Sequence, residues 1–371
     1  MKKSILLSVL SLAVFVTDML AQNTLKEATK GEFLMGVAIN TRQHDGSNPV
    51  EEAIIANQFS AIVPENCMKS GEIQVEEGKF NFEDADRFVA FGEKNNLTMT
   101  GHCLVWHSQL PRWFTVGPDG KLASPELLKA RMKTHINTVV KRYKGKLKGW
   151  DVVNEAFEDN GTYRNSAFYR ILGEEFIPLA FQYAHEADPN IELYYNDYNM
   201  YKASKCDGVI EMVKKLKARG IRIDAVGMQG HMVMGSPTVE EMEASIVKLG
   251  AAGVKVMITE WDISILPREN NRTSANIADN MGYAQSMDPY RNGVPAEAMT
   301  QWNKRMTDMF SLFLKHADVI DRVTVWGLGD ATTWLNNFPV RGRMDYPMLY
   351  DRQMKPKAVI QQMIDLAKKA K

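Results

Sequence analysis

The sequence predicts a single-domain α/β protein with a (β/α)8 fold, the TIM barrel. The chain has 371 residues, enough for one large barrel, and short apolar β-type runs alternate along it with helical stretches. Two of these runs end on a glutamate, Glu155 and Glu260. A carboxylate at the end of a buried strand needs a partner or a function, and in a barrel chemistry collects at the C-terminal strand ends.

Eight segments have the nearly continuous apolar character of strands that are covered on both faces. They are 33–39, 61–64, 98–106, 149–154, 191–195, 225–229, 254–259 and 323–327. Apolar residues recur at helical spacing in 125–143, 203–219, 238–252 and 296–316. We therefore expect each strand to be followed by a helix, with a long loop at 264–300 after the seventh strand.

Residues 1–22 are typical of a secretory signal peptide. Lys2 and Lys3 precede an apolar run at 5–16, and a cleavage point is available near Ala21. The run is shorter than the roughly 20 residues that a membrane-spanning helix needs. We expect an exported protein, periplasmic or extracellular, in which 23–371 form one catalytic domain without a membrane span.

Composition argues against one class of partner. The formal net charge of +0 gives no basic face of the kind that binds nucleic acid, so we expect no nucleic-acid partner. We also expect a monomer. Cys67, Cys103 and Cys206 are an odd number in an exported protein, and each is expected to be a buried small residue. A bridge between Cys67 and Cys103 stays open.

Polar and aromatic side chains gather where the predicted strands end. They are Glu65, Asn66 and Lys69; His102, Trp106, His107 and Gln109; Asn154 and Glu155; Asn196, Asp197 and Tyr198; Gln229 and His231; Glu260 and Asp262; and Trp326 with Trp334. Two glutamates at one barrel mouth can cleave a glycosidic bond, one as acid and one as nucleophile. The acid then needs a raised pKa, and the nucleophile needs hydrogen-bond donors that keep it ionised.

Six segments in order resemble glycoside hydrolase family 10, which consists largely of endo-β-1,4-xylanases. They are PENCMK at 64–69, GHCLVWHSQLP at 101–111, WDVVNE at 150–155, NDYN at 196–199, GMQGH at 227–231 and ITEWD at 258–262. The similarity runs from about Phe33 to Ile364. It implies retaining, double-displacement hydrolysis of internal β-1,4-xylosidic bonds in xylan and xylo-oligosaccharides, without a cofactor or metal.

The resemblance also implies roles for individual residues. Glu155 matches the acid/base and Glu260 the nucleophile, with His231 bonded to the nucleophile and Asp262 as its support. Asn154 matches the residue that holds the sugar 2-hydroxyl. Gln229 matches a partner of the acid, and Tyr198 matches a sugar platform on the leaving-group side. Eight positions match substrate-binding residues on the non-reducing side of the cleaved bond. They are Glu65, Asn66, Lys69, His102, Trp106, Gln109, Trp326 and Trp334.

The sequence departs from the family pattern at three positions. Ser70 replaces a common Trp and Gly329 a common Thr, and both changes could alter the floor of the cleft and the fine substrate preference. Trp261 replaces a common Leu beside the nucleophile. Strand alternation predicts that Trp261 points away from the sugar, toward the helix layer.

The residues leave alternatives open. Trp106 and Trp326 could belong to the barrel core, His102 and His107 could be core histidines, and Lys69 could be a solvated surface residue. The protein could instead act on another β-glucan or an aryl glycoside, or it could be a catalytically silent glycan-binding protein. In a metal-dependent hydrolase the ligands would be His102, His107, His231 and Asp197, although no HxH or HExxH spacing supports that reading.

Overall fold

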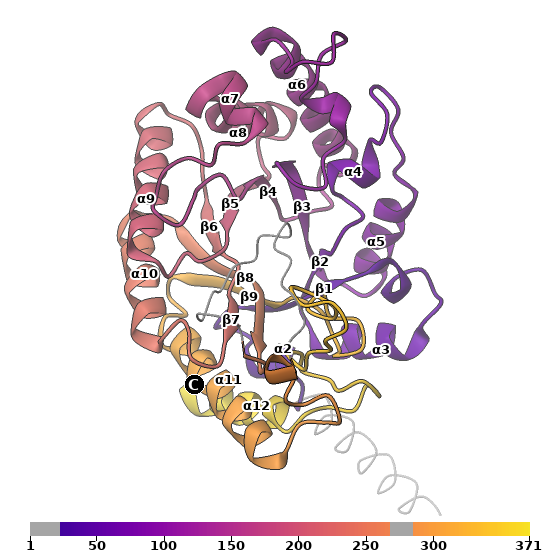
Figure 1. Ribbon diagram of the computed structural model, residues 1–371, viewed down its shortest axis with the longest axis vertical. Coiled ribbons are helices and arrows are strands. Elements are labelled where there is room, and N and C mark those ends of the chain that lie inside the picture. Colours follow the sequence, from indigo (N-terminus) through magenta and orange to yellow (C-terminus); the bar gives the residue numbers. More distant parts are fainter. Residues whose placement is uncertain (1–22, 268–284) are drawn as a thin grey trace, which may run out of the picture.

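The computed structural model describes residues 23–267 and 285–371 of the chain (Figure 1). The predicted signal peptide, 1–22, lies outside the described residues, and so does 268–284, the middle of the predicted 264–300 loop.

Parallel strands form a closed barrel at the centre of the described chain, as the sequence predicts. The strands are β1 (Leu34–Ile39), β2 (Ala61–Pro64), β3 (Thr98–Trp106), β4 (Gly149–Asn154), β5 (Glu192–Asp197), β6 (Ala225–Met228), β7 (His231–Val233), β8 (Lys255–Ser264) and β9 (Ile320–Val325). The sheet order is β6-β5-β4-β3-β2-β1-β9-β8-β7, and a further β6–β8 pairing closes the ring. The short β7 continues the line of β6 along β8, so the other strands form the eight-stranded barrel.

Helices surround this barrel (Figure 1). They are α2 (Leu25–Ala28), α3 (Pro49–Gln58), α4 (Ser70–Ile73), α5 (Glu83–Lys94), α6 (Pro125–Arg142), α7 (Ala167–Leu172), α8 (Phe176–Ala187), α9 (Ala203–Ala218), α10 (Val239–Ala251), α11 (Ala296–Lys315) and α12 (Val359–Ala370). Short 3₁₀ turns lie at η1 (Thr41–Gln43), η2 (Arg112–Phe114), η3 (Gly173–Glu175) and η5 (Gln285–Met287). The four helices predicted from periodicity correspond to α6, α9, α10 and α11, and their bounds agree to within one residue at each end.

Local sequence explains where the long helices begin. At α6 the Ser124 hydroxyl accepts a hydrogen bond from the Leu127 N–H, and Pro125 occupies the first helical position, where its missing donor costs nothing. At α10, Thr238 and Glu241 form a reciprocal capping box. These caps fix the helix starts beside the strand ends and thereby define the rim of the barrel.

Two strands extend further at their C-terminal ends than the sequence predicts, and both differences bear on the rim. β5 runs to Asp197 rather than 195, and β8 runs to Ser264 rather than 259, because β7 pairs with its last residues. Glu260 therefore lies inside a strand and not at its end. β9 begins before the predicted residue 323 and ends at Val325, short of 327.

The helix-facing side of the barrel is packed as expected. Trp261 is fully buried and its ring meets Phe313 of α11 edge-on, with ring centroids 5.2 Å apart, so its predicted orientation is confirmed. Cys67, Cys103 and Cys206 are buried and free, so the bridge left open does not form. No helix in the described ranges is long and apolar enough to cross a membrane.

A glycine at the β3–β4 contact offers a test of this packing. A Cβ added at Gly101 would lie 2.2 Å from the ring of Trp150, which is fully buried and has no room to move. Overpacking of this kind costs about 1–3 kcal/mol, so Gly101→Ala should lower the thermal unfolding midpoint. Gly235, which has open space around its Cβ position, gives the matched control. Equal midpoints for Gly101→Ala and Gly235→Ala would contradict the tight contact.

Candidate active site

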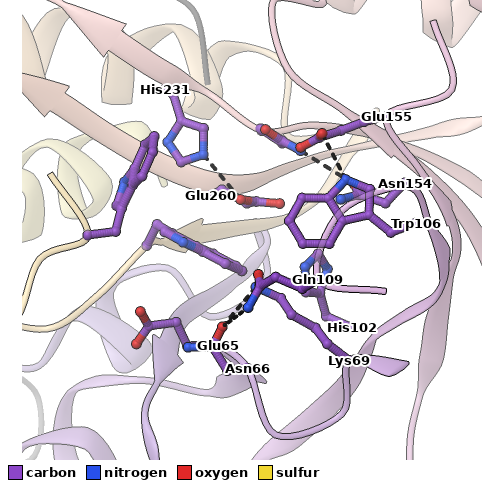
Figure 2. Close-up of a pocket in the computed structure, with 13 residues that line it drawn as sticks. Glu65, Asn66, Lys69, His102, Trp106, Gln109, Asn154, Glu155, His231 and Glu260 are labelled. Carbon is purple, nitrogen blue, oxygen red and sulfur yellow. Dashed lines mark hydrogen bonds and ion pairs between the residues drawn. The ribbon is translucent and has the colours of Figure 1, made fainter. Parts of the chain in front are cut away.

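One cavity at the C-terminal ends of the strands brings together nearly all the predicted site residues (Figure 2). Its lining consists of Glu65, Asn66, Lys69, His102, Trp106, Gln109, Asn154, Glu155, Gln229, His231, Glu260, Trp326 and Trp334. Of the predicted set, Tyr198 and Asp262 lie behind this lining. Figure 2 shows the Glu155 and Glu260 side chains converging in the cavity from different strands.

Glu260 is a buried carboxylate held by donors. The Asn196 amide donates to one of its oxygens at 2.7 Å, and His231 Nε2 donates to the other at 3.1 Å. His231 Nδ1 donates in turn to Asp262 at 2.8 Å. Burial by itself raises the pKa of Glu260. The hydrogen bond from His231, the charges of His102 and His231, and the hydrogen bond from Asn196 together outweigh burial, so the pKa lies below its ordinary value.

The charge state of His231 follows from the same contacts. Burial favours the neutral ring, yet the two carboxylates of Asp262 and Glu260 overcome that effect and raise the pKa of His231 to about 10. The ring is therefore an imidazolium near neutral pH, and both of its N–H groups donate.

Glu155 is buried to a similar degree, at 5 % exposed, but its environment favours the neutral acid. Burial is the main cause of its raised pKa, and the negative charge of Asp197 adds to it, with a smaller addition from Glu260. Hydrogen bonds from Gln229, at 3.1 Å, and from Trp106 Nε1, at 2.8 Å, oppose the rise. The two carboxyls thus have pKa shifts of opposite sign, the pattern that separates an acid from a nucleophile.

An amide network connects the two carboxyls. Asn196 Nδ2, which binds Glu260, also donates to Asn154 Oδ1 at 3.0 Å, and Gln229 Nε2, which binds Glu155, approaches the same oxygen at 3.4 Å. Thr259 Oγ1 donates to Asn196 Oδ1 at 2.6 Å and fixes that amide. Because the Asn154 oxygen accepts these bonds, its NH₂ group is the part that can donate to a ligand hydroxyl.

Lys69 is a cavity residue and not a solvated surface lysine. It is 6 % exposed, and its ammonium donates to Gln109 at 2.7 Å and to Asn66 at 3.0 Å. It also lies 5.0 Å from the ring centroid of Trp106. Burial raises the pKa of the adjacent Glu65, with Lys69 opposing the rise. This side of the cavity is a hydrogen-bonded polar floor beside an aromatic face.

His102 and the tryptophans combine packing with access to the cavity. His102 pairs with Asp151 at 2.9 Å and meets Trp326 edge-on, at 5.4 Å between ring centroids. Trp106 and Trp326 are almost fully buried, as core residues are, and both also line the cavity, as substrate-binding residues would. Trp334 Nε1 donates to Asp262 at 2.7 Å, which places its ring beside His231.

Tyr198 is placed outside the cavity lining. Its hydroxyl accepts from Arg164 at 2.6 Å, and Lys205 Nζ lies 3.8 Å from its ring centroid. Its predicted role as a sugar platform stays a prediction. Ser70 and Gly329 also lie outside the lining, and a Cβ at Gly329 would approach Met354 Sδ to 2.6 Å.

The proposed metal-ligand set is not assembled. Within 23–267 and 285–371, no group of three or more His, Cys, Asp or Glu side chains is arranged to hold a metal ion. His102 and His231 are paired with aspartates, and Asp197 is paired with Lys205 at 2.7 Å.

Sequence reasoning missed two direct partners of the site. Asn196 binds Glu260, whereas the sequence pattern indicates only a polar residue after the fifth strand, and Asp151 supports His102 from within β4. The signal for Asp151 was present, since it is a charged residue inside an apolar run. Its partner could not be read from the sequence, because the contact joins different strands.

Comparison with known proteins gives matches along almost the whole chain. A family model described as glycosyl hydrolase family 10 matches residues 24–366. The endo-1,4-beta-xylanase A of Xylanibacter ruminicola is 46% identical over 345 residues, covering 93% of this chain and 94% of that protein. An endo-1,4-beta-xylanase of Geobacillus stearothermophilus is 36% identical, covering 92% of this chain and 98% of its own. The solved structure of a GH10 endoxylanase from a sugarcane soil metagenome has a TM-score of 0.90 at 43% identity, covering 92% and 99% of the two chains.

The imidazolium at His231 can be tested without an activity assay. Because its pKa is raised to about 10, its charge stabilises the fold fully below the unfolded value of about 6.5, and that stabilisation is lost as pH rises through about 10. NMR titration of the ring should show this value, and Asp262→Asn should lower it. A His231 ring that titrates near pH 6.5 in the wild-type protein would contradict the arrangement.

Proposed function

Since the chain belongs to glycosyl hydrolase family 10, we infer that it is an endo-1,4-β-xylanase, hydrolysing internal β-1,4-xylosidic bonds of xylan with retention of configuration. One observation from the structure supports this most directly. Two buried glutamates face one cavity with pKa shifts of opposite sign. That division of charge is what double displacement at a glycosidic bond requires.

The site residues have distinct tasks in this mechanism. Glu260, ionised and held by His231 and Asn196, attacks the anomeric carbon, while Glu155 gives its proton to the departing glycosidic oxygen. A covalent glycosyl-enzyme forms on Glu260. Glu155, now a carboxylate, removes a proton from water, which attacks the anomeric carbon and releases Glu260. Asn154 donates to the sugar 2-hydroxyl, a contact that strengthens toward the transition state.

We propose that the cavity selects xylose through its rim. Lys69, Gln109, Trp326 and Trp334 belong to its lining, and Lys69 and Trp326 are almost fully buried. Such packing leaves little room at C5, where glucose carries a hydroxymethyl group and xylose carries none. Aromatic faces also suit the apolar C–H face of a pyranose ring.

Export and oligomeric state complete the proposal. The charged start and apolar run of residues 1–22 support secretion to the periplasm or the medium. The proposal takes the mature enzyme to be a monomer. Fractionation of the producing cells, with N-terminal sequencing of the active protein, tests this. Active protein that stays inside the cell with residues 1–22 attached would contradict it.

Loss of the nucleophile should remove activity without removing the fold. Glu260→Ala should lower turnover by several orders of magnitude, and azide should restore cleavage of an activated aryl xyloside with inverted product, because a small anion can occupy the vacated site. Glu297→Ala, at an exposed glutamate of α11, is the control and should turn over normally. Turnover by Glu260→Ala near the wild-type rate, without azide, would overturn the assignment.

Loss of the acid should depend on the leaving group. Glu155→Ala should impair xylan hydrolysis far more than cleavage of a dinitrophenyl xylobioside, because only a poor leaving group needs the proton. The wild-type pH profile should be bell-shaped. Activity falls at low pH as Glu260, with its lowered pKa, is protonated, and at high pH as Glu155, with its raised pKa, loses its proton. The variant should lack the basic limb; equal losses on both substrates would argue against this role.

Substrate choice can be measured on matched aryl glycosides. A small extra group in a tight pocket is worth about 1–3 kcal/mol, so kcat/KM for an aryl xylobioside should exceed that for the cellobioside by about 10–200-fold per crowded site. Equal values would favour a general β-glucanase that keeps both glutamates in their roles. Binding without hydrolysis would indicate the silent glycan-binding protein, and loss of activity in a chelator would indicate a metal-dependent hydrolase.

A further inference from the structure

The backbone at Glu155 has an unusual conformation for its residue type. Glu155 is the first residue after β4, and its φ of 57° lies in the left-handed region that residues other than glycine rarely adopt. Such a conformation persists only when its surroundings determine it strongly. The direction of the Glu155 carboxyl therefore depends on whatever holds this turn.

Three side chains behind the cavity bind the turn at 155–157. The guanidinium of Arg164 donates to the Glu155 carbonyl at 2.9 Å. The Tyr195 hydroxyl accepts from the Ala156 N–H at 3.0 Å, and Asp197 Oδ2 accepts from the Phe157 N–H at 3.3 Å. Three consecutive residues of the turn are thus each held by a different side chain, in addition to the backbone bond from Glu155 N–H to the Asn196 carbonyl at 2.9 Å.

The three side chains are themselves held by partners, and Arg164 donates to the Tyr198 hydroxyl at 2.6 Å. Tyr195 and Asp197 are adjacent on the same face of β5, both are fully buried, and the Tyr195 hydroxyl donates to Asp197. Lys205 of α9, also fully buried, pairs with the other Asp197 oxygen at 2.7 Å. None of these residues lines the cavity, so none is placed to touch the sugar.

We propose that Tyr195, Asp197 and Arg164 are positioning residues for the general acid: they hold the left-handed turn that directs the Glu155 carboxyl into the cavity, and Asp197 places a buried negative charge behind it. This proposal rests on the proposed function, since it assumes that Glu155 is the acid. It goes beyond that function by assigning a second layer of residues to the proton-transfer step alone.

The electrostatics around Glu155 agree with this assignment. The charged and titratable groups coupled to it are Asp197 from β5, Glu260 from β8, Lys69 from the start of α4, Cys103 from β3, and Tyr198. After burial, Asp197 contributes most to raising the pKa of Glu155, ahead of Glu260. Asp197 therefore adds to the effect of burial in keeping the acid protonated, and it also holds the backbone of the turn.

The competing explanation is that Asp197 and Lys205 only anchor α9 to the barrel. That role would affect stability and would lower all activities together. A positioning role would affect the step in which Glu155 gives its proton, so the ratio of activities on poor and good leaving groups separates the two explanations.

Tyr195→Phe provides the first test, with Tyr194→Phe as its control. Tyr194 is the preceding residue of β5, and its hydroxyl donates to Glu192 at 2.5 Å, away from the turn at Glu155. Removing the Tyr195 hydroxyl should lower kcat/KM on an aryl xylobioside with a poor leaving group about tenfold, the effect of one lost buried hydrogen bond, and change it less than about twofold on the dinitrophenyl analogue. Tyr194→Phe should change neither. Equal losses on both substrates, or no loss, would overturn the proposal.

The pH profile gives the second test. In Asp197→Asn, Lys205 keeps Asp159 as an ion-pair partner at 3.7 Å. The basic limb of kcat/KM should then move to lower pH, because Glu155 loses its proton more readily once the negative charge of Asp197 is gone. An unmoved basic limb would contradict the electrostatic part of the proposal. If this variant does not fold, the Tyr195→Phe ratio decides alone. Glu155→Ala is measured beside them. If Glu155→Ala shows no dependence on the leaving group, the acid assignment itself fails. If Glu155→Ala shows that dependence and Tyr195→Phe does not, only the positioning proposal fails.

Discussion

Two glutamate carboxyls are buried in one cavity, and the mechanism needs one of them neutral and the other ionised. The groups that surround the two carboxyls produce this difference. Burial alone would raise the pKa of both Glu155 and Glu260. They diverge because Glu260 receives an imidazolium and an amide donor, whereas Glu155 faces a second buried carboxylate, Asp197. Both members of the catalytic pair are glutamates, so the groups around each one decide which of them is the acid.

The barrel supplies these neighbours from several strands. The nucleophile and Asp262 lie on β8, its histidine on β7, its amide donor on β5, and the acid just after β4. Parallel strands bring their C-terminal ends to one rim, so residues that are far apart in sequence meet there. Ladder register also shifts between β8 and β9 at Ile258–Trp261, and such irregularities redirect side chains near a site.

Much of this was accessible from the sequence. The apolar runs predict the barrel strands to within a few residues. The polar and aromatic residues in and just after the C-terminal parts of these runs predict nearly the whole cavity lining. What could not be predicted depends on contacts between strands. The length of β8 follows from its pairing with β7, the role of Asn196 from a hydrogen bond across strands, and the position of Tyr198 from Arg164 and Lys205. Local patterns carry no information on such pairings.

The most direct test of the account is the protonation of the two carboxyls in the free enzyme. With ¹³C-labelled glutamate, the side-chain carboxyl carbons of Glu155 and Glu260 can be titrated by NMR and assigned through their alanine variants. The account predicts that Glu260 ionises first, below the ordinary value for glutamate, and that Glu155 ionises at a clearly higher pH. The reverse order, or two carboxyls that ionise together near the ordinary value, would contradict it.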